Sequence, residues 1–324
     1  MAPVQSPSLR REDRPAFAGN GSIVARFSHH CNCTGPPPGG GRRPASPHTG
    51  ARPKVKDFAR FIGVDYSGAE APVAGLTGLR VYLAEREKAP VEVTAPQSVG
   101  RWWTRKAIAA WLVDELAKPL PTLVGIDHGF SFPLAYFREH GLASDWPGFL
   151  DDFQRHWPTD EDHMCVDFIR QGVEGRGDLR GGSSRSRRVC EVRTGRAKSV
   201  FHFDVPGSVA KSTHAGLPWL RFIRNTLRDA VHFWPFDGWE IPPGRSVIAE
   251  VYPSLWRASF PVEGLTRDQH DAYAAAAWLS QADRDGRLAA AFRPALTPAD
   301  REVAEIEGWI LGVPGSGLAG PDPP

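Results

Sequence analysis

Cysteine is scarce in this chain of 324 residues, and long apolar runs are missing from it. The four cysteines, Cys31, Cys33, Cys165 and Cys190, are too few and too unevenly spaced for a disulfide framework, which favours a reducing compartment. No apolar stretch approaches the roughly 20 residues of a membrane span, and the first residues lack the apolar core of a secretory signal. These absences predict a cytoplasmic protein that has no membrane partner.

A strong charge of either sign is also missing, because the formal net charge is only +2 and the sequence pI is near 8.4. Attraction to a polyanion such as nucleic acid would therefore have to come from local clusters of basic residues. The chain is 41% hydrophobic, which is enough to bury a sizeable core in one large domain or two small ones.

Composition divides the chain into three parts. Residues 1–56 are rich in proline, glycine and arginine and show no apolar periodicity, so we expect a disordered tail. Residues 57–313 carry the periodic patterns of a folded domain. Residues 314–324 return to proline and glycine, and we expect a second disordered tail there.

The folded part predicts an α/β domain with a mixed sheet of five strands. Apolar runs predict the strands, and helical spacing predicts helices between and after them. The first three strands are joined by short connections, which favour an antiparallel meander, and the last two are expected to run parallel. The predicted strands are 61–65, 78–85, 91–94, 123–127 and 247–251, and the main predicted helices are 104–118, a helix capped by Thr266, and 298–311. A helical and basic insertion at about 131–245 precedes the last strand.

Acidic residues recur where these elements begin or end. Asp65 and Asp127 each follow an apolar strand with a glycine turn, Glu250 stands close to a strand-ending proline, and Asp268 and Asp271 share a face at the head of a helix. If the strands are neighbours, these five carboxylates converge, and converging carboxylates suit divalent cations such as Mg²⁺ or Mn²⁺. They are therefore our candidate metal ligands, and Asp65, Asp127, Glu250 and Asp271 are the candidate catalytic residues.

Each acid also has a simpler interpretation. A strand-end aspartate often bonds to its own backbone in a turn, and the helix dipole alone favours Asp268. Glu250 also suits an ion pair with an arginine of the basic insertion.

Basic residues gather in residues 173–198, where Arg187 and Arg188 lie among glycines and serines. A flexible basic loop of this kind would draw in a phosphate backbone, although a solvated insertion has the same composition. Lys211 and His214 follow Gly207 in a segment that lacks the spacing of a phosphate-binding P-loop, and they remain candidate phosphate contacts or ordinary loop residues.

At the level of residues, the chain resembles the domain-of-unknown-function family 429, whose members are described as predicted nucleases of the ribonuclease H-like fold. The residues that carry this resemblance are Ile62 to Asp65, Gly125 to Asp127, Gly207 to Trp219, Glu250 to Pro253 and Asp268 to Trp278. It implies a ribonuclease H-like sheet in which Asp65 bridges two metal ions, Asp127 binds one of them and Asp271 completes the set. The pair Asp268 and Asp271 is similar to the helix acids of Holliday-junction resolvases.

The expected function is hydrolysis of a phosphodiester bond in nucleic acid by a two-metal mechanism, with the carboxylates as metal ligands. Two other classes stay open. The same superfamily contains ATP-binding phosphotransferases, whose phosphate-gripping turns resemble Asp127-His128-Gly129, although they need a second copy of the fold. A binding module that has kept the fold without catalysis is the third class.

Overall fold

The computed structural model describes residues 58–261 and 263–315. The predicted tails, 1–56 and 314–324, lie outside the described residues except for residues 314 and 315. In the part that the structure describes, no helix combines the length and the apolar character that crossing a membrane requires.

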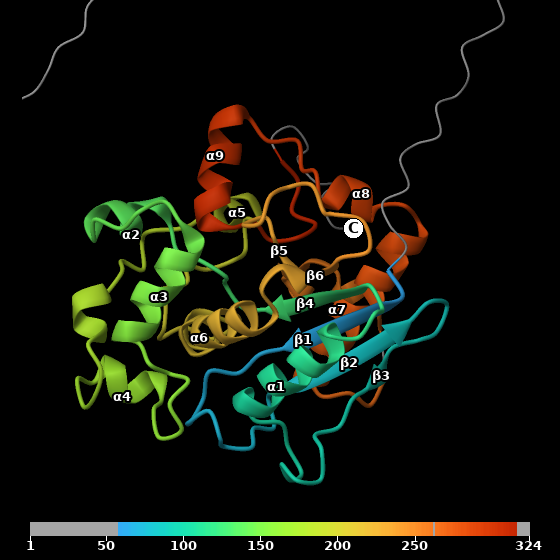
Figure 1. The fold of residues 1–324 in the computed structure, drawn as a ribbon, viewed down its shortest axis with the longest axis horizontal. Coiled ribbons are helices and arrows are strands. Elements are labelled where there is room, and N and C mark those ends of the chain that lie inside the picture. The colour runs from blue at the N-terminus through green and yellow to red at the C-terminus, as the bar shows by residue number, and fades with distance from the viewer. Residues whose placement is uncertain (1–57, 262, 316–324) are drawn as a thin grey trace, which may run out of the picture. The chain divides into compact units, whose positions relative to one another are not determined.

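A mixed sheet of six strands forms the centre of the described chain, in the order β3-β2-β1-β4-β6-β5 (Figure 1). The first three strands pair antiparallel, and β1, β4, β6 and β5 run parallel. The strands are β1 (Arg60–Asp65), β2 (Arg80–Glu85), β3 (Val91–Glu92), β4 (Thr122–Asp127), β5 (Val231–Trp234) and β6 (Ser246–Glu250).

The mixed sheet and its flanking helices agree with the predicted fold class, but the prediction of five strands was wrong by one. The additional strand, β5, comes from the predicted insertion and extends the edge of the sheet beside β6. Its four residues are all buried, so they lack the alternation of polar and apolar residues that reveals a half-exposed strand.

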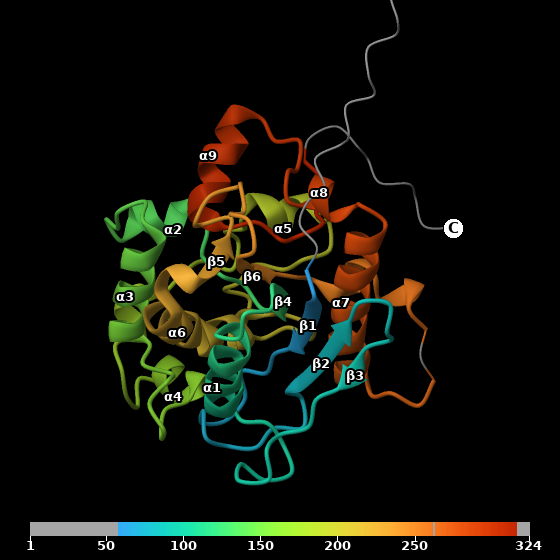
Figure 2. The ribbon, with the colours of Figure 1, turned by 45° about the vertical axis from the view of Figure 1, so that its right-hand side comes forward.

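Helices cover both faces of the sheet. Helix α1 (Arg105–Leu116) and α6 (Ala210–Leu227) pack on one face, and α7 (Arg267–Arg284) packs on the other, as the two views in Figures 1 and 2 show. The remaining helices are α2 (Leu134–Glu139), α3 (Trp146–His156), α4 (Val166–Arg170), α5 (Val189–Arg193), α8 (Leu288–Ala291) and α9 (Pro298–Glu307). Short 3₁₀ turns are η1 (Gly177–Arg180), η2 (Arg228–Ala230), η3 (Pro253–Leu255) and η4 (Arg257–Ser259).

The alternation of side chains along β1 assigns residues to these two faces. Ile62 and Val64 belong to the core beneath α1 and α6, whereas Phe61 belongs to the core beneath α7. The start of α7 is fixed by the predicted capping box, in which the hydroxyl of Thr266 accepts from the Gln269 N–H and the Gln269 side chain accepts from the Thr266 N–H.

Helix α7 approaches β1 so closely that only glycine fits at one position of the strand. A Cβ atom placed on Gly63 would lie 2.3 Å from the carbonyl oxygen of Ala272 and 2.6 Å from the backbone nitrogen of Ala276. Both of these α7 residues are alanines, and both are fully buried. The small residues on the strand and the helix therefore set the distance between the two elements, and through it the position of the head of α7.

We predict that Gly63→Ala destabilises the fold because the new methyl group would collide with backbone atoms, which cannot rotate away. Overpacking of this kind typically costs about 1–3 kcal/mol, and each kcal/mol lowers the melting temperature of a domain this large by about 2–4 °C. Thermal unfolding followed by circular dichroism measures the effect.

Gly75→Ala is the matched control, since a Cβ atom at Gly75 would have its nearest neighbour at 3.4 Å, an ordinary contact. Equal melting temperatures for the two variants would contradict the close packing of α7 on β1.

Candidate functional site

Asp65 and Asp127 lie side by side at the carboxyl ends of two neighbouring strands. They are Cα partners across the parallel pair β1 and β4, and adjacent strands are about 4.8 Å apart. Both point to the α7 face, because each stands two residues after a glycine, Gly63 or Gly125, at which a Cβ would meet α7. The parallel register of β1 and β4 therefore brings these two acids together.

Asp268 and Asp271 reach the same place from the head of α7, and their charges join those of the strand acids. Burial raises the pKa of Asp65 well above its ordinary value, and the negative charges of Asp127, Asp268 and Asp271 raise it further. The pKa of Asp127 is raised well above its ordinary value by burial, by Asp271 and by Glu250. Such mutual effects require the carboxylates to lie near one another.

Three of these carboxylates have no protein partner. Within the described part of the chain, the side chains of Asp65, Asp127 and Asp268 form no hydrogen bond and no ion pair. The pKa of Asp268 is also raised, first by burial and then by Asp271. Enclosed carboxylates that have no hydrogen-bond or ion-pair partner among the described residues are costly, and they suit a hard cation.

Asp271 differs from these three because an arginine already binds it. The Nη1 atom of Arg257 donates to both Asp271 oxygens, at 2.6 Å and 2.7 Å. Arg267 lies 3.8 Å away and is mostly exposed. Asp271 was predicted to be a free metal ligand. This prediction is corrected, because Arg257 occupies both carboxylate oxygens and takes the place of a metal cation. This pair could not be predicted from the sequence, since Arg257 lies in the short turn η4, which has no periodicity.

Glu250 does not join the acids on the α7 face. It is the Cα partner of Ile126, not of Asp127, and this offset of one residue turns its side chain to the opposite face of the sheet. There Arg188 donates to both of its oxygens at 2.6 Å and 2.7 Å, and the Phe130 N–H donates at 3.0 Å. Its predicted roles in catalysis and metal binding are corrected to a buried ion pair, the alternative that its position near the basic insertion had left open.

Arg188 is likewise a structural residue. Its side chain is 1% exposed and binds Glu191 as well as Glu250. An Arg188 side chain in this network cannot reach a substrate phosphate, so its predicted role is corrected. The flexible basic loop was also the wrong description of residues 173–198, because η1 and α5 form there and Arg180, Arg188 and Arg193 have carboxylate partners.

The other predicted phosphate contacts differ in how far protein contacts already occupy their side chains. His214 is buried among aromatic rings, and this burial lowers its pKa to about 3, so it is uncharged and cannot bind phosphate as a cation. Lys211 is half-exposed and forms an ion pair with Asp167 at 2.6 Å. Arg187 is half-buried and donates to the carbonyl oxygens of Ala197 and Glu191. The prediction for His214 is therefore corrected, while Lys211 keeps a side chain at the surface.

A narrow pocket opens beside Asp127. Its lining also includes Lys198, Gly207, Val209, Glu250 and Tyr252. Lys198, which belongs to the basic segment 173–198 picked out in the sequence, lines this pocket and donates to the carbonyl oxygen of Pro206.

The described residues contain no group of three or more aspartate, glutamate, histidine and cysteine side chains already arranged around one ion position. The donors that remain for a metal ion are Asp65, Asp127 and Asp268. Oxygen donors of this type suit Mg²⁺ and Mn²⁺, which keep several water molecules when they bind.

Comparison with known proteins adds no relative to this description. No protein-family model matches the chain, and no match was found among the curated proteins or the solved structures.

The raised pKa values predict a pH-dependent stability. A carboxyl group whose pKa is higher in the folded chain than in the unfolded chain binds its proton more tightly when folded. Its favourable contribution is complete below the ordinary value of about 4 and is lost as the pH rises through the folded value. Asp65→Asn replaces the carboxyl group with an uncharged amide, so folding stability is no longer lost at this position as the pH rises. We therefore expect its melting temperature to exceed that of the unchanged protein at pH 7, by about 2–4 °C for each kcal/mol of repulsion removed.

The difference should shrink as the pH falls towards 4, where both proteins carry an uncharged group at position 65. Asp114→Asn serves as control because Asp114 is exposed on α1. A gain that is the same at pH 4 and pH 7, or a loss at pH 7, would rule out the like-charge cluster.

Proposed function

We propose that the protein is a metal-dependent phosphodiester hydrolase that acts on nucleic acid. The observation that carries this proposal is the group of partnerless carboxylates, Asp65, Asp127 and Asp268, at two strand ends and one helix head. The strand order β3-β2-β1-β4-β6 supports the ribonuclease H-like resemblance, with β5 as an added edge strand. The resemblance to family 429 is part of this proposal and is supported by the same strand order.

The three free carboxylates fit Mg²⁺ or Mn²⁺ through the chemistry of their oxygen atoms. When bound, such ions activate water and stabilise the charge of the leaving oxygen. The charges of both Asp127 and Asp268 act on Asp65, which is the Cα partner of Asp127. Asp65 would therefore hold a metal ion together with these two residues.

The arginines near the carboxylates partly compensate their negative charge. Arg257 neutralises Asp271, and the charges of Arg257 and Arg267 lower the pKa of Asp127, opposing the effect of its burial. This leaves three carboxylates for a metal ion in place of the five expected from the sequence. The positive charge beside them also favours the approach of a phosphodiester, which carries a negative charge at neutral pH.

A non-catalytic binding module is the second candidate, and the arginine partners of Asp271 and Glu250 favour it. A site in which arginines already hold two of five acids has less need of metal ions. The phosphotransferase candidate has no comparable support, because it needs two copies of the fold and the described residues form one six-stranded sheet.

A cleavage assay separates these candidates. Labelled DNA and RNA, each as single strands, duplexes and branched molecules, are incubated with the protein in Mn²⁺, in Mg²⁺ and in EDTA. We expect cleavage in Mn²⁺ and none in EDTA. Asp65→Asn and Asp127→Asn should each reduce the rate by about 100-fold or more, since even groups that only support a metal ligand contribute about 10- to 100-fold.

Asp114→Asn, which changes an exposed aspartate on α1, should cleave at the unchanged rate. Cleavage that survives both site substitutions would exclude this site as its source. A complete lack of metal-dependent cleavage across the panel, together with retained nucleic-acid binding, would favour the binding module.

A further inference from the structure

A second pocket is lined by aromatic rings. It has a volume of about 830 Å³ including its open mouth. Its walls come from α4, the turn around η1, the segment near Phe203 and one face of α6. The lining includes Trp157, Ile169, Arg170, Phe201, Phe203 and His214. We call it the aromatic pocket.

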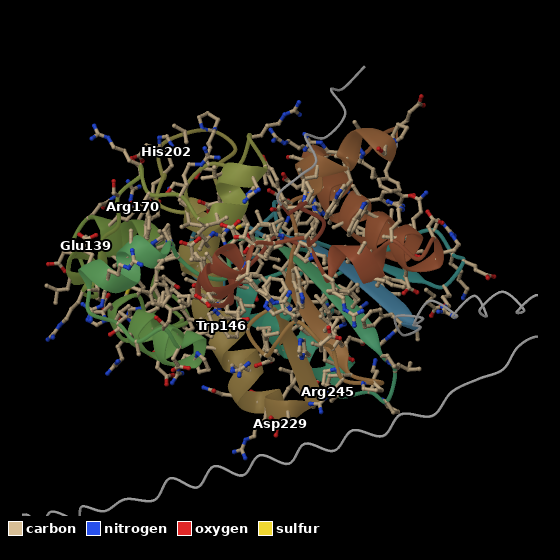
Figure 3. All side chains as sticks on the ribbon, turned by 90° about the horizontal axis from the view of Figure 1, so that it is seen from above. Glu139, Trp146, Arg170, His202, Asp229 and Arg245 are labelled. Carbon is tan, nitrogen blue, oxygen red and sulfur yellow. The ribbon has the colours of Figure 1, made fainter. Side chains whose placement is uncertain are left out.

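The aromatic rings of this pocket pack against one another. Trp157 and Phe203 are nearly parallel, at 9°, with ring centroids 6.4 Å apart. The His214 ring contacts both, with centroid distances of 4.6 Å and 4.7 Å. The guanidinium of Arg170 lies 4.3 Å from the centroid of the Phe203 ring. Figure 3 shows Arg170 and His202, the neighbour of Phe203, at the same end of the molecule.

Glycines keep this pocket open. Four of its twelve lining residues are glycine, and they have no side chain to fill it. At Gly182 a Cβ atom would lie 2.3 Å from the Phe201 ring, and at Gly177 it would lie 2.7 Å from the indole of Trp157. The chain therefore runs directly against these two rings, which are otherwise held by neighbouring aromatic side chains.

Two polar atoms on the lining rings have no partner. The Nε1–H of Trp157 is buried and donates to no described residue. The Nδ1 atom of His214 bonds to the carbonyl oxygen of Ala210 at 2.9 Å, so Nδ1 carries the proton and Nε2 of this uncharged ring keeps its lone pair. No described residue donates to Nε2. The Nε2 atom of His214 is thus an acceptor on a ring of the lining, and it is complementary to a donor on the edge of a flat ligand.

The aromatic pocket is connected to the carboxylate site by a single stretch of chain. Lys198, Gly207 and Val209 line the pocket beside Asp127, whereas Phe203 and His214, in the same stretch, line the aromatic pocket. Exposed arginines, Arg176 and Arg185, lie one and three residues along the chain from the lining residues Gly177 and Gly182. A strand whose base occupies the aromatic pocket would thus meet a stretch of chain that also lines the pocket beside Asp127.

We propose that the aromatic pocket binds a nucleobase that has left its stack, and that the protein therefore prefers single-stranded or distorted nucleic acid to an intact duplex. This inference rests on the proposed action on nucleic acid and names the form of the substrate. Stacking on aromatic rings tolerates any base, and hydrogen bonds from the edge of the base add selectivity.

Binding is measured by fluorescence anisotropy in EDTA, which prevents metal-dependent cleavage, with one labelled oligonucleotide as a single strand and as a duplex. The single strand should bind at least 10-fold more tightly. Phe203→Ala should weaken single-strand binding by about 5- to 100-fold, the range typical of one base stacked on one aromatic ring, and should leave duplex binding unchanged. Phe222→Ala is the matched control, because Phe222 is 38% exposed on α6 and does not line the pocket.

A second variant tests the pocket without removing a ring. Gly181→Phe places a side chain at the rim, where a Cβ atom would have its nearest neighbour at 3.9 Å, so the fold should tolerate it while the mouth is blocked. It should weaken single-strand binding as Phe203→Ala does. Unchanged single-strand affinity in both variants, or an equal loss for single strand and duplex, would overturn the base-binding pocket.

Competition with nucleoside monophosphates identifies the source of the base. Competition that depends on Phe203 supports the pocket and assigns it to free nucleotides, whereas competition by oligonucleotides alone supports the pocket and assigns it to strands. Pocket-dependent binding without metal-dependent cleavage would overturn the hydrolase and keep the pocket. Cleavage that is indifferent to both pocket variants would keep the hydrolase and overturn the pocket.

Discussion

The contact between helix α7 and strand β1 determines where the charged groups of this protein meet. Gly63 has no side chain, and Ala272 and Ala276 have small ones, so the two backbones come within the distance that a single methyl group would occupy. A helix held this close to a strand presents its first turn to the end of that strand. Asp268 and Asp271 are consequently brought to Asp65, and the parallel register of β1 and β4 adds Asp127.

This arrangement opposes stability, because burial and like charge both disfavour the ionised carboxylates. The protein resolves the conflict differently on the two faces of the sheet. On the α6 face, Glu250 is fully paired with Arg188, and that buried pair connects β6 to α5. On the α7 face, Arg257 pairs with Asp271, but three carboxylates have no hydrogen-bond or ion-pair partner among the described residues. Carboxylates with raised pKa values in such an arrangement are candidates for a functional site, which is the basis of the proposed hydrolase.

Much of the sheet could be predicted because its strands are buried and its turns contain glycine or proline. The runs that end in Asp65 and Asp127 share one pattern, and identical patterns on neighbouring parallel strands end at the same level. Glu250 was misplaced for the same physical reason: a register offset of one residue reverses the face of a side chain, and register is not visible in the sequence. The fully buried strand β5 was missed because nothing in its four residues alternates. Arg188 and His214 look like surface contacts in a basic, glycine-rich sequence, and only tertiary packing shows that they are enclosed.

The central claim is that Asp65 and Asp127 share one electrostatic environment. The most direct measurement is the titration of aspartate carboxyl carbons by ¹³C nuclear magnetic resonance in the metal-free protein and in Asp127→Asn. This account predicts that Asp65 titrates well above its ordinary value of about 4 and that its apparent pKa falls when residue 127 loses its charge. Titration of Asp65 near 4 in both proteins, unaffected by residue 127, would contradict the account.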